Sequence, residues 1–207
     1  MALLTALCAT ALLMGLGVSL LLLGTGEAVL GAHHRDAIAA TYAASGAAAV
    51  GVAELRRLTS WSGVVAPGVY PEVSSTPARS VDSSLTPTSP WGERFDLRAL
   101  TVRVQMESDA AGSPGDPVIW RLFVYLPLTR LLPQSAQRNP FYLAVWVADD
   151  PADGDGNASA DTNGILLVHA EALAPGELRG RVEMSVERRP AAGGADVFRI
   201  LAVRPNP

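Results

Sequence analysis

The sequence contains no lysine and only one cysteine. All 16 basic residues are arginine, and the net charge is −4. It has no basic patch of the kind that binds nucleic acid, so we expect no nucleic-acid partner. Because Cys8 is alone, no intrachain disulfide can form, and the chain must rely on its apolar core. Cys8 lies in an apolar stretch, and we interpret it as a small apolar side chain without a lipid.

Charged side chains are also missing from residues 1–26. About 20 apolar residues in a helix cross a bilayer core of roughly 30 Å, so this segment is predicted to be a transmembrane helix. The rival interpretation is a cleaved signal peptide, whose apolar part is shorter, about 7–15 residues, and follows a basic start. Glycines seven apart share a helix face and let helices approach closely in lipid. The membrane and assembly positions expected on this helix are Leu12, Leu13, Gly17, Leu21, Gly24 and Glu27.

Proline is absent from residues 27–58, which are rich in alanine. Alanine is the best helix former, and apolar residues recur here at helical spacing. We therefore predict that residues 27–58 continue the helix outside the membrane. A helix of this length would measure on the order of 85 Å at 1.5 Å per residue.

The following segment, residues 59–96, is rich in serine, threonine and proline, and we interpret it as a linker or surface loop. Residues 97–207 are predicted to form an antiparallel β domain, because short apolar runs alternate with Gly, Pro and Asp turns. The six strand candidates are residues 100–106, 118–126, 141–147, 165–169, 181–187 and 197–203. The expected fold class is α+β: a long N-terminal transmembrane helix packed on one face of an antiparallel sheet, with the other face in water.

An acidic loop in residues 149–164 is the candidate metal site, because calcium prefers many oxygen ligands. A count for an EF-hand loop from Asp153 fails, since its sixth position is Ala158 and its twelfth is Gly164. A looser calcium loop and a solvated turn both remain open. The candidate ligands are Asp153, Asp155, Asn157 and Asp161.

Catalytic motifs are missing: there is no nucleophile elbow, phosphate loop or zinc signature. His169 falls in a predicted strand with no acid or cysteine partner indicated by spacing, so we interpret it as structural. We expect no enzyme activity, no small-molecule substrate and no cofactor other than calcium.

Several short motifs occur in an order that resembles PilX-type pilus assembly proteins. The N-terminal set is segment 2–7, the apolar run, Glu27, Arg35-Asp36-Ala37 and Tyr42-Ala43-Ala44-Ser45-Gly46. The C-terminal set is Asp161-Thr162-Asn163-Gly164 before an apolar strand, and Arg179-Gly180-Arg181-Val182-Glu183. The resemblance covers about residues 2–58 and 140–204. Major pilins carry an early glutamate in the helix that this chain lacks, so the resemblance implies an accessory or minor component.

The resemblance implies a pilin-like fold and a mechanical function in type IV pilus assembly and cell adhesion. The helix would lie in the bacterial inner membrane as a single pass, with the β domain periplasmic or on the cell surface. Its partners would be other pilins, minor pilins or a tip adhesin. Two alternatives remain open: a single-pass protein whose periplasmic β domain binds a partner or calcium without any link to pili, and a secreted β protein with a cleaved signal.

Overall fold

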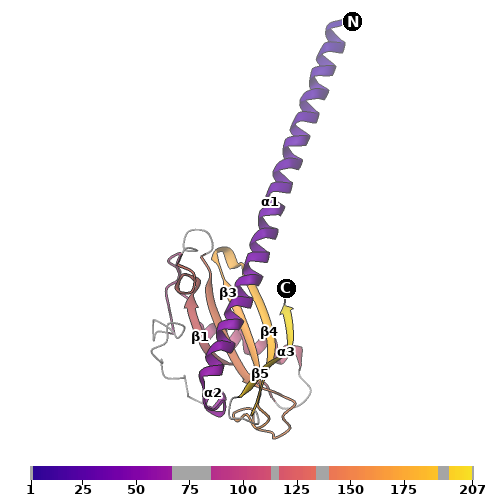
Figure 1. The fold of residues 1–207 in the computed structure, drawn as a ribbon. Helices are drawn as coiled ribbons and strands as arrows, with labels where there is room; N and C mark the ends of the chain where they lie inside the picture. Colours follow the sequence, from indigo (N-terminus) through magenta and orange to yellow (C-terminus); the bar gives the residue numbers. More distant parts are fainter. Residues whose placement is uncertain (1, 67–84, 113–116, 134–139, 191–195, 207) are drawn as a thin grey trace. The chain divides into compact units, whose positions relative to one another are not determined.

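The computed structural model describes residues 2–66, 85–112, 117–133, 140–190 and 196–206. The chain divides into two compact units, Met1–Ile38 and Ala39–Pro207. Half of the linker predicted over residues 59–96, including its central serine-rich part, lies outside the described residues. The fold is α+β, with one long helix and a five-stranded antiparallel sheet (Figure 1).

Helix α1 (Ala2–Arg57) is unbroken over 56 residues, which confirms the predicted long helix. In the first unit its apolar side chains are exposed; Leu12, Leu13 and Leu21 are 70%, 68% and 71% exposed. Among the described residues, this is the one helix long and apolar enough to cross a membrane. The short helix α2 (Ser62–Val65) follows it and buries Val64 and Val65.

The sheet is a meander in which each strand pairs with the next one along the chain (Figure 1). Its strands are β1 (Arg121–Pro127), β2 (Tyr142–Asp149), β3 (Ile165–Leu173), β4 (Arg179–Arg189) and β5 (Val197–Asn206). Short 3₁₀ turns η1 (Leu128–Arg130) and η3 (Pro175–Glu177) lie beside the strand ends. Five of the six predicted strands are thereby confirmed. Every residue of β2 is buried, so both faces of the sheet are covered.

One face of the sheet packs against the C-terminal part of α1, as predicted. The buried helix positions recur every three or four residues, which is the period of one helix face. Besides the buried Glu54, they are Ala40, Ala43, Ala44, Ala47, Ala48, Gly51, Val52 and Leu55. Val182, Met184 and Val186 of β4 belong to the same core cluster. Small side chains on the helix allow a close approach: a Cβ at Gly180 would overlap the backbone carbonyl of Ala40.

The prediction of a strand at residues 100–106 is wrong, because this segment lies in helix α3 (Leu97–Ala111). Asp96 caps the helix by accepting hydrogen bonds from Arg98 N (2.9 Å) and Ala99 N (3.1 Å), and Gly112 ends it at φ 63°. The alternating pattern failed because it overlaps a helical one, in which Leu97 and Val104 are buried.

The expectation that the second face of the sheet meets water is also wrong. Leu97 and Val104 of α3 pack there against Trp120, Tyr142 and Trp146 in a second core cluster. The indole Nε1 of Trp146 donates a hydrogen bond to Thr101 Oγ1 (2.8 Å). Helix α3 therefore shields polar side chains on this face of the sheet that would otherwise be exposed.

Candidate functional site

The polar face of the sheet beneath α3 carries a network of ionised side chains. Glu171 of β3 is fully buried, yet it contacts Arg103 Nη2 (2.6 Å), Arg181 Nε (3.4 Å) and His169 Nε2 (3.2 Å). Buried charges are tolerated when they are paired in this way. Glu107 of α3 accepts two further hydrogen bonds from Arg181, at 2.9 and 3.2 Å. These ion pairs and hydrogen bonds hold α3 against β3 and β4.

His169 lies at the centre of this network. Its Nδ1 is 3.0 Å from Glu183 Oε1 and its Nε2 is 3.2 Å from Glu171 Oε1, an arrangement that suits the doubly protonated ring. Burial opposes the positive charge, but the bonds to Glu171 and Glu183 outweigh it and raise the pKa of His169. With both nitrogens held by carboxylates, His169 is not free to accept a substrate proton.

The two glutamates respond in the opposite direction. Burial favours the neutral form of Glu171, but His169 and Arg103 outweigh it and lower its pKa. The hydrogen bond from His169 is the main reason that the pKa of Glu183 is also lowered. His169 thus lies among structural contacts, with acidic partners that sequence spacing did not predict. The sequence did contain a signal for Glu171, because residues two apart on a strand share a face.

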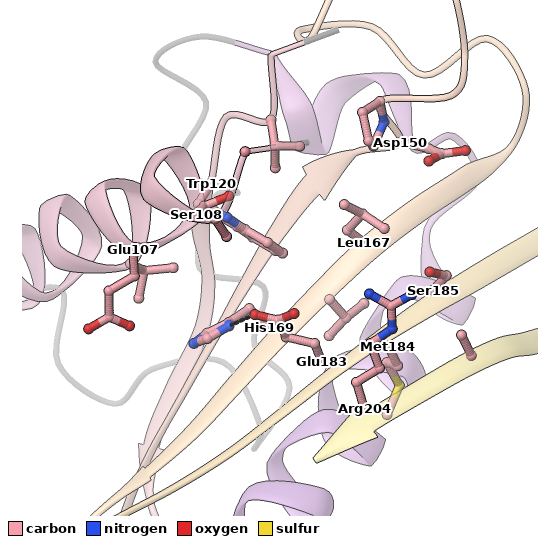
Figure 2. A pocket seen from close by; sticks show the side chains of 17 residues that line it. Glu107, Ser108, Trp120, Asp150, Leu167, His169, Glu183, Met184, Ser185 and Arg204 are labelled. Atoms are coloured by element: carbon pink, nitrogen blue, oxygen red, sulfur yellow. Dashed lines mark hydrogen bonds and ion pairs between the residues drawn. The ribbon is translucent and has the colours of Figure 1, made fainter. Parts of the chain in front are cut away.

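A cavity of about 460 Å³ adjoins this network. Figure 2 shows Glu107 on α3 and His169, Glu183 and Arg204 on the strands around it. The rings of Trp120 and His169 meet edge-on with centroids 5.5 Å apart on its wall. The indole nitrogen of Trp120 is enclosed and has no hydrogen-bond partner among the described residues. The cavity therefore combines an aromatic wall with charged groups.

The acidic loop between β2 and β3 is organised by its own side chains. Asp153 accepts hydrogen bonds from Thr162 N (3.1 Å) and Thr162 Oγ1 (2.6 Å), and Asp161 Oδ1 accepts one from Gly164 N (2.7 Å). One carboxylate oxygen each from Asp149, Asp153 and Asp161 lies within 4.8 Å of the others. The structure therefore brings together two of the four predicted ligands and adds Asp149.

The other two predicted ligands are used in local turns. Asp155 Oδ1 accepts a hydrogen bond from Asn157 N (2.7 Å), and Asn157 Oδ1 accepts one from Ser159 N (3.2 Å). Neither belongs to the group of three aspartates. Burial, together with the charges of Asp153, Asp161 and Asp155, raises the pKa of Asp149 to about 6.

The predicted assembly positions of α1 all lie in its exposed, apolar part. Leu12, Leu13, Gly17, Leu21, Gly24 and Glu27 are exposed in the first unit. A Cβ at Gly17 or Gly24 would meet no atom of the described residues within 4 Å. Cys8 is exposed on the same helix.

Comparison with known proteins adds no identification. No protein-family model matches the chain, and neither a curated protein nor a solved structure does.

Proposed function

We propose that this protein is an accessory or minor pilin-like component of a type IV pilus assembly system. The observation that carries the proposal is the division of helix α1 into two parts of different chemistry. Its first part exposes leucines over a length sufficient to span a bilayer. Its second part, from Ala40 to Leu55, is a core element of an antiparallel sheet domain. Pilin-like proteins use one helix for both purposes.

In this proposal the apolar part of α1 lies in the bacterial inner membrane, and the sheet domain lies in the periplasm or on the cell surface. The function is mechanical, because the protein would act by contacts with other pilins, minor pilins or a tip adhesin. The paired histidine and carboxylates beneath α3 support this view, since they stabilise the domain and leave His169 no role as a base. The order of short motifs that resembles PilX-type proteins gives independent support.

Two glycine pairs divide the apolar part of α1 into opposite faces. Gly17 and Gly24 are seven residues apart, and Gly15 and Gly26 are eleven apart. At 3.6 residues per turn each pair lies on one face, and the two faces are about 180° apart. In the part of the chain that the structure describes, no atom lies within 4 Å of a Cβ added at any of the four positions. Since small residues allow helices to pack closely in lipid, the proposal assigns the contact with other pilins to the face of Gly17 and Gly24.

The first test is the mass of the mature chain in the membrane fraction of its own cells, with and without prepilin peptidase. We expect a peptidase-dependent shift that leaves a free or methylated terminus next to the apolar run, and fewer surface pili when the gene is deleted. An unprocessed chain in cells whose pilus number is unaffected by the deletion would contradict the proposal. It would favour a single-pass protein with another partner.

The second test compares two double variants with the same chemical change. Gly17→Leu with Gly24→Leu should reduce co-purification of identified pilins by about tenfold or more, because bulky side chains keep the helices apart. Gly15→Leu with Gly26→Leu is the matched control and should leave co-purification unchanged. Equal loss in both variants would contradict an assembly face on this side of the helix.

A further inference from the structure

Three aspartates converge where β2 ends and the loop to β3 closes. Asp149 is the last residue of β2, and its side chain joins those of Asp153 and Asp161 within 4.8 Å. Asp149 is only 4% exposed. Its Oδ1 atom is enclosed and meets no hydrogen-bond donor in the part of the chain that the structure describes. A buried carboxylate oxygen without a donor is unfavourable unless a cation or a proton compensates it.

The other two carboxylates are already oriented. Asp153 is held by the backbone nitrogen and the hydroxyl of Thr162, and Asp161 by the backbone nitrogen of Gly164. The bonds between Asp153 and Thr162 tie the two ends of the loop together, whereas the bond to Asp161 is local. Each carboxylate has about four lone-pair positions, so these bonds use only part of its capacity. Free lone pairs therefore remain on all three aspartates.

We propose that Asp149, Asp153 and Asp161 form a binding site for one calcium ion. Calcium takes six to eight oxygen ligands at about 2.3–2.6 Å, so opposite ligands lie about 4.6–5.2 Å apart. The oxygens of the three aspartates lie within 4.8 Å of one another, so all three can reach one such ion. Magnesium gives up its water reluctantly and is usually bound through one or two carboxylates, so a group of three carboxylates favours calcium. Water and backbone carbonyls complete the coordination.

The basic group whose charge acts on Asp161 is held by other partners. Arg188 interacts with Asp161 through its charge. However, its Nε donates to Asp196 (2.6 Å), and its Nη2 donates to the carbonyl of Thr59 (2.7 Å). Asp155 adds negative charge to the surroundings of Asp149. The loop therefore presents a net negative potential to a divalent cation.

The test is a calcium titration of the full chain in detergent after treatment with EDTA, followed by calorimetry and by thermal unfolding. We expect saturable binding of one ion per chain and a higher unfolding midpoint with calcium. Asp149→Asn and Asp161→Asn should each weaken binding by at least about tenfold. Asp149→Asn removes a buried charge, so it should fold at least as stably as the wild type without calcium.

Asp155→Asn is the matched control, since it removes the same charge from the same loop. Its amide oxygen can still accept the hydrogen bond from Asn157, and calcium affinity should remain within about threefold of wild type. Equal losses in Asp155→Asn and Asp149→Asn would overturn the proposal and indicate diffuse attraction only. Absence of saturable binding up to about 10 mM calcium, above the range of weak extracellular modules, would also overturn it. Magnesium binding as tight as calcium binding would refute the choice of ion. None of these outcomes depends on a connection with pili.

Discussion

Replacing Gly51 by alanine tests how closely helix α1 packs on the sheet. A Cβ at Gly51 would lie 2.8 Å from Cγ1 of Val145, whereas ordinary contacts begin at 3.4 Å. Val145 is fully buried and β-branched, so its side chain cannot rotate away cheaply. We expect Gly51→Ala to force the helix and β2 apart.

Gly46→Ala is the control, because Gly46 lies in the same helix and an added Cβ there meets no described atom within 4 Å. Both substitutions gain the same intrinsic helix propensity, about 0.5–1 kcal/mol. At Gly46 this gain should appear as added stability. At Gly51 overpacking costs about 1–3 kcal/mol. The two variants should therefore differ by about 1–3 kcal/mol in the free energy of unfolding, with Gly51→Ala the less stable.

The measurement is unfolding of the full chain in detergent, followed by tryptophan fluorescence. Trp61 and Trp146 are both buried in the sheet unit and report on its unfolding. Gly180→Ala provides a more severe case, since its Cβ would meet the backbone of Ala40. If Gly51→Ala were as stable as Gly46→Ala, the close approach of helix and sheet would be refuted.

Two predictions concern the polar network and its neighbour beneath α3. The pKa values of Glu171 and Glu183 lie below their ordinary 4.5 and that of His169 lies above its ordinary 6.5. The two ionised glutamates therefore stabilise the fold fully above pH 4.5, and this stabilisation is lost as the pH falls through their folded pKa values. The protonated His169 stabilises the fold fully below pH 6.5, and this stabilisation is lost as the pH rises through its folded pKa. His169→Gln should lower the free energy of unfolding, measured with urea, by about 1–3 kcal/mol near pH 5.5 and by less near pH 9. A loss of stability that is the same at both pH values would contradict a charged histidine. Thr101→Val leaves the buried indole nitrogen of Trp146 without its acceptor and should lower the free energy of unfolding by about 1–3 kcal/mol. Thr101→Ser keeps a hydroxyl at this position and should lower it by less. Equal thermal midpoints for the two variants would contradict the role of this hydrogen bond.

Local patterns were sufficient to predict most elements of the sheet. Apolar runs bounded by Gly, Pro and Asp identified β1 to β5, and the N-terminal apolar run together with the alanine-rich stretch without proline identified α1. They failed at α3, where Leu100, Val102 and Val104 alternate as in a strand. Val102 is 58% exposed in the structure, whereas Val104 is buried. Asp96 and Gly112, which cap this helix, were the stronger signals and are present in the sequence.

Long-range pairing explains why the polar face of the sheet was misjudged. Glu171 and His169 on alternate positions of β3 look like the solvent side of a strand. They are buried because Arg103, 68 residues earlier in the chain, reaches Glu171 from α3. No periodicity within β3 indicates this partner, since the complementary charge lies on another element.

The acidic loop shows the same limit for the candidate site. Comparison of the loop with the EF-hand pattern selects Asp155 and Asn157, because that pattern assumes that ligands follow one another along the chain at fixed spacing. The group of three aspartates in the structure depends instead on strand register, since Asp149 pairs with Leu166 across β2 and β3. This pairing draws the end of one strand beside the start of the next, so that Asp149 meets Asp161 although twelve positions separate them. Once two antiparallel strands are predicted, the residues at their facing ends are therefore better ligand candidates than those at the tip of the loop.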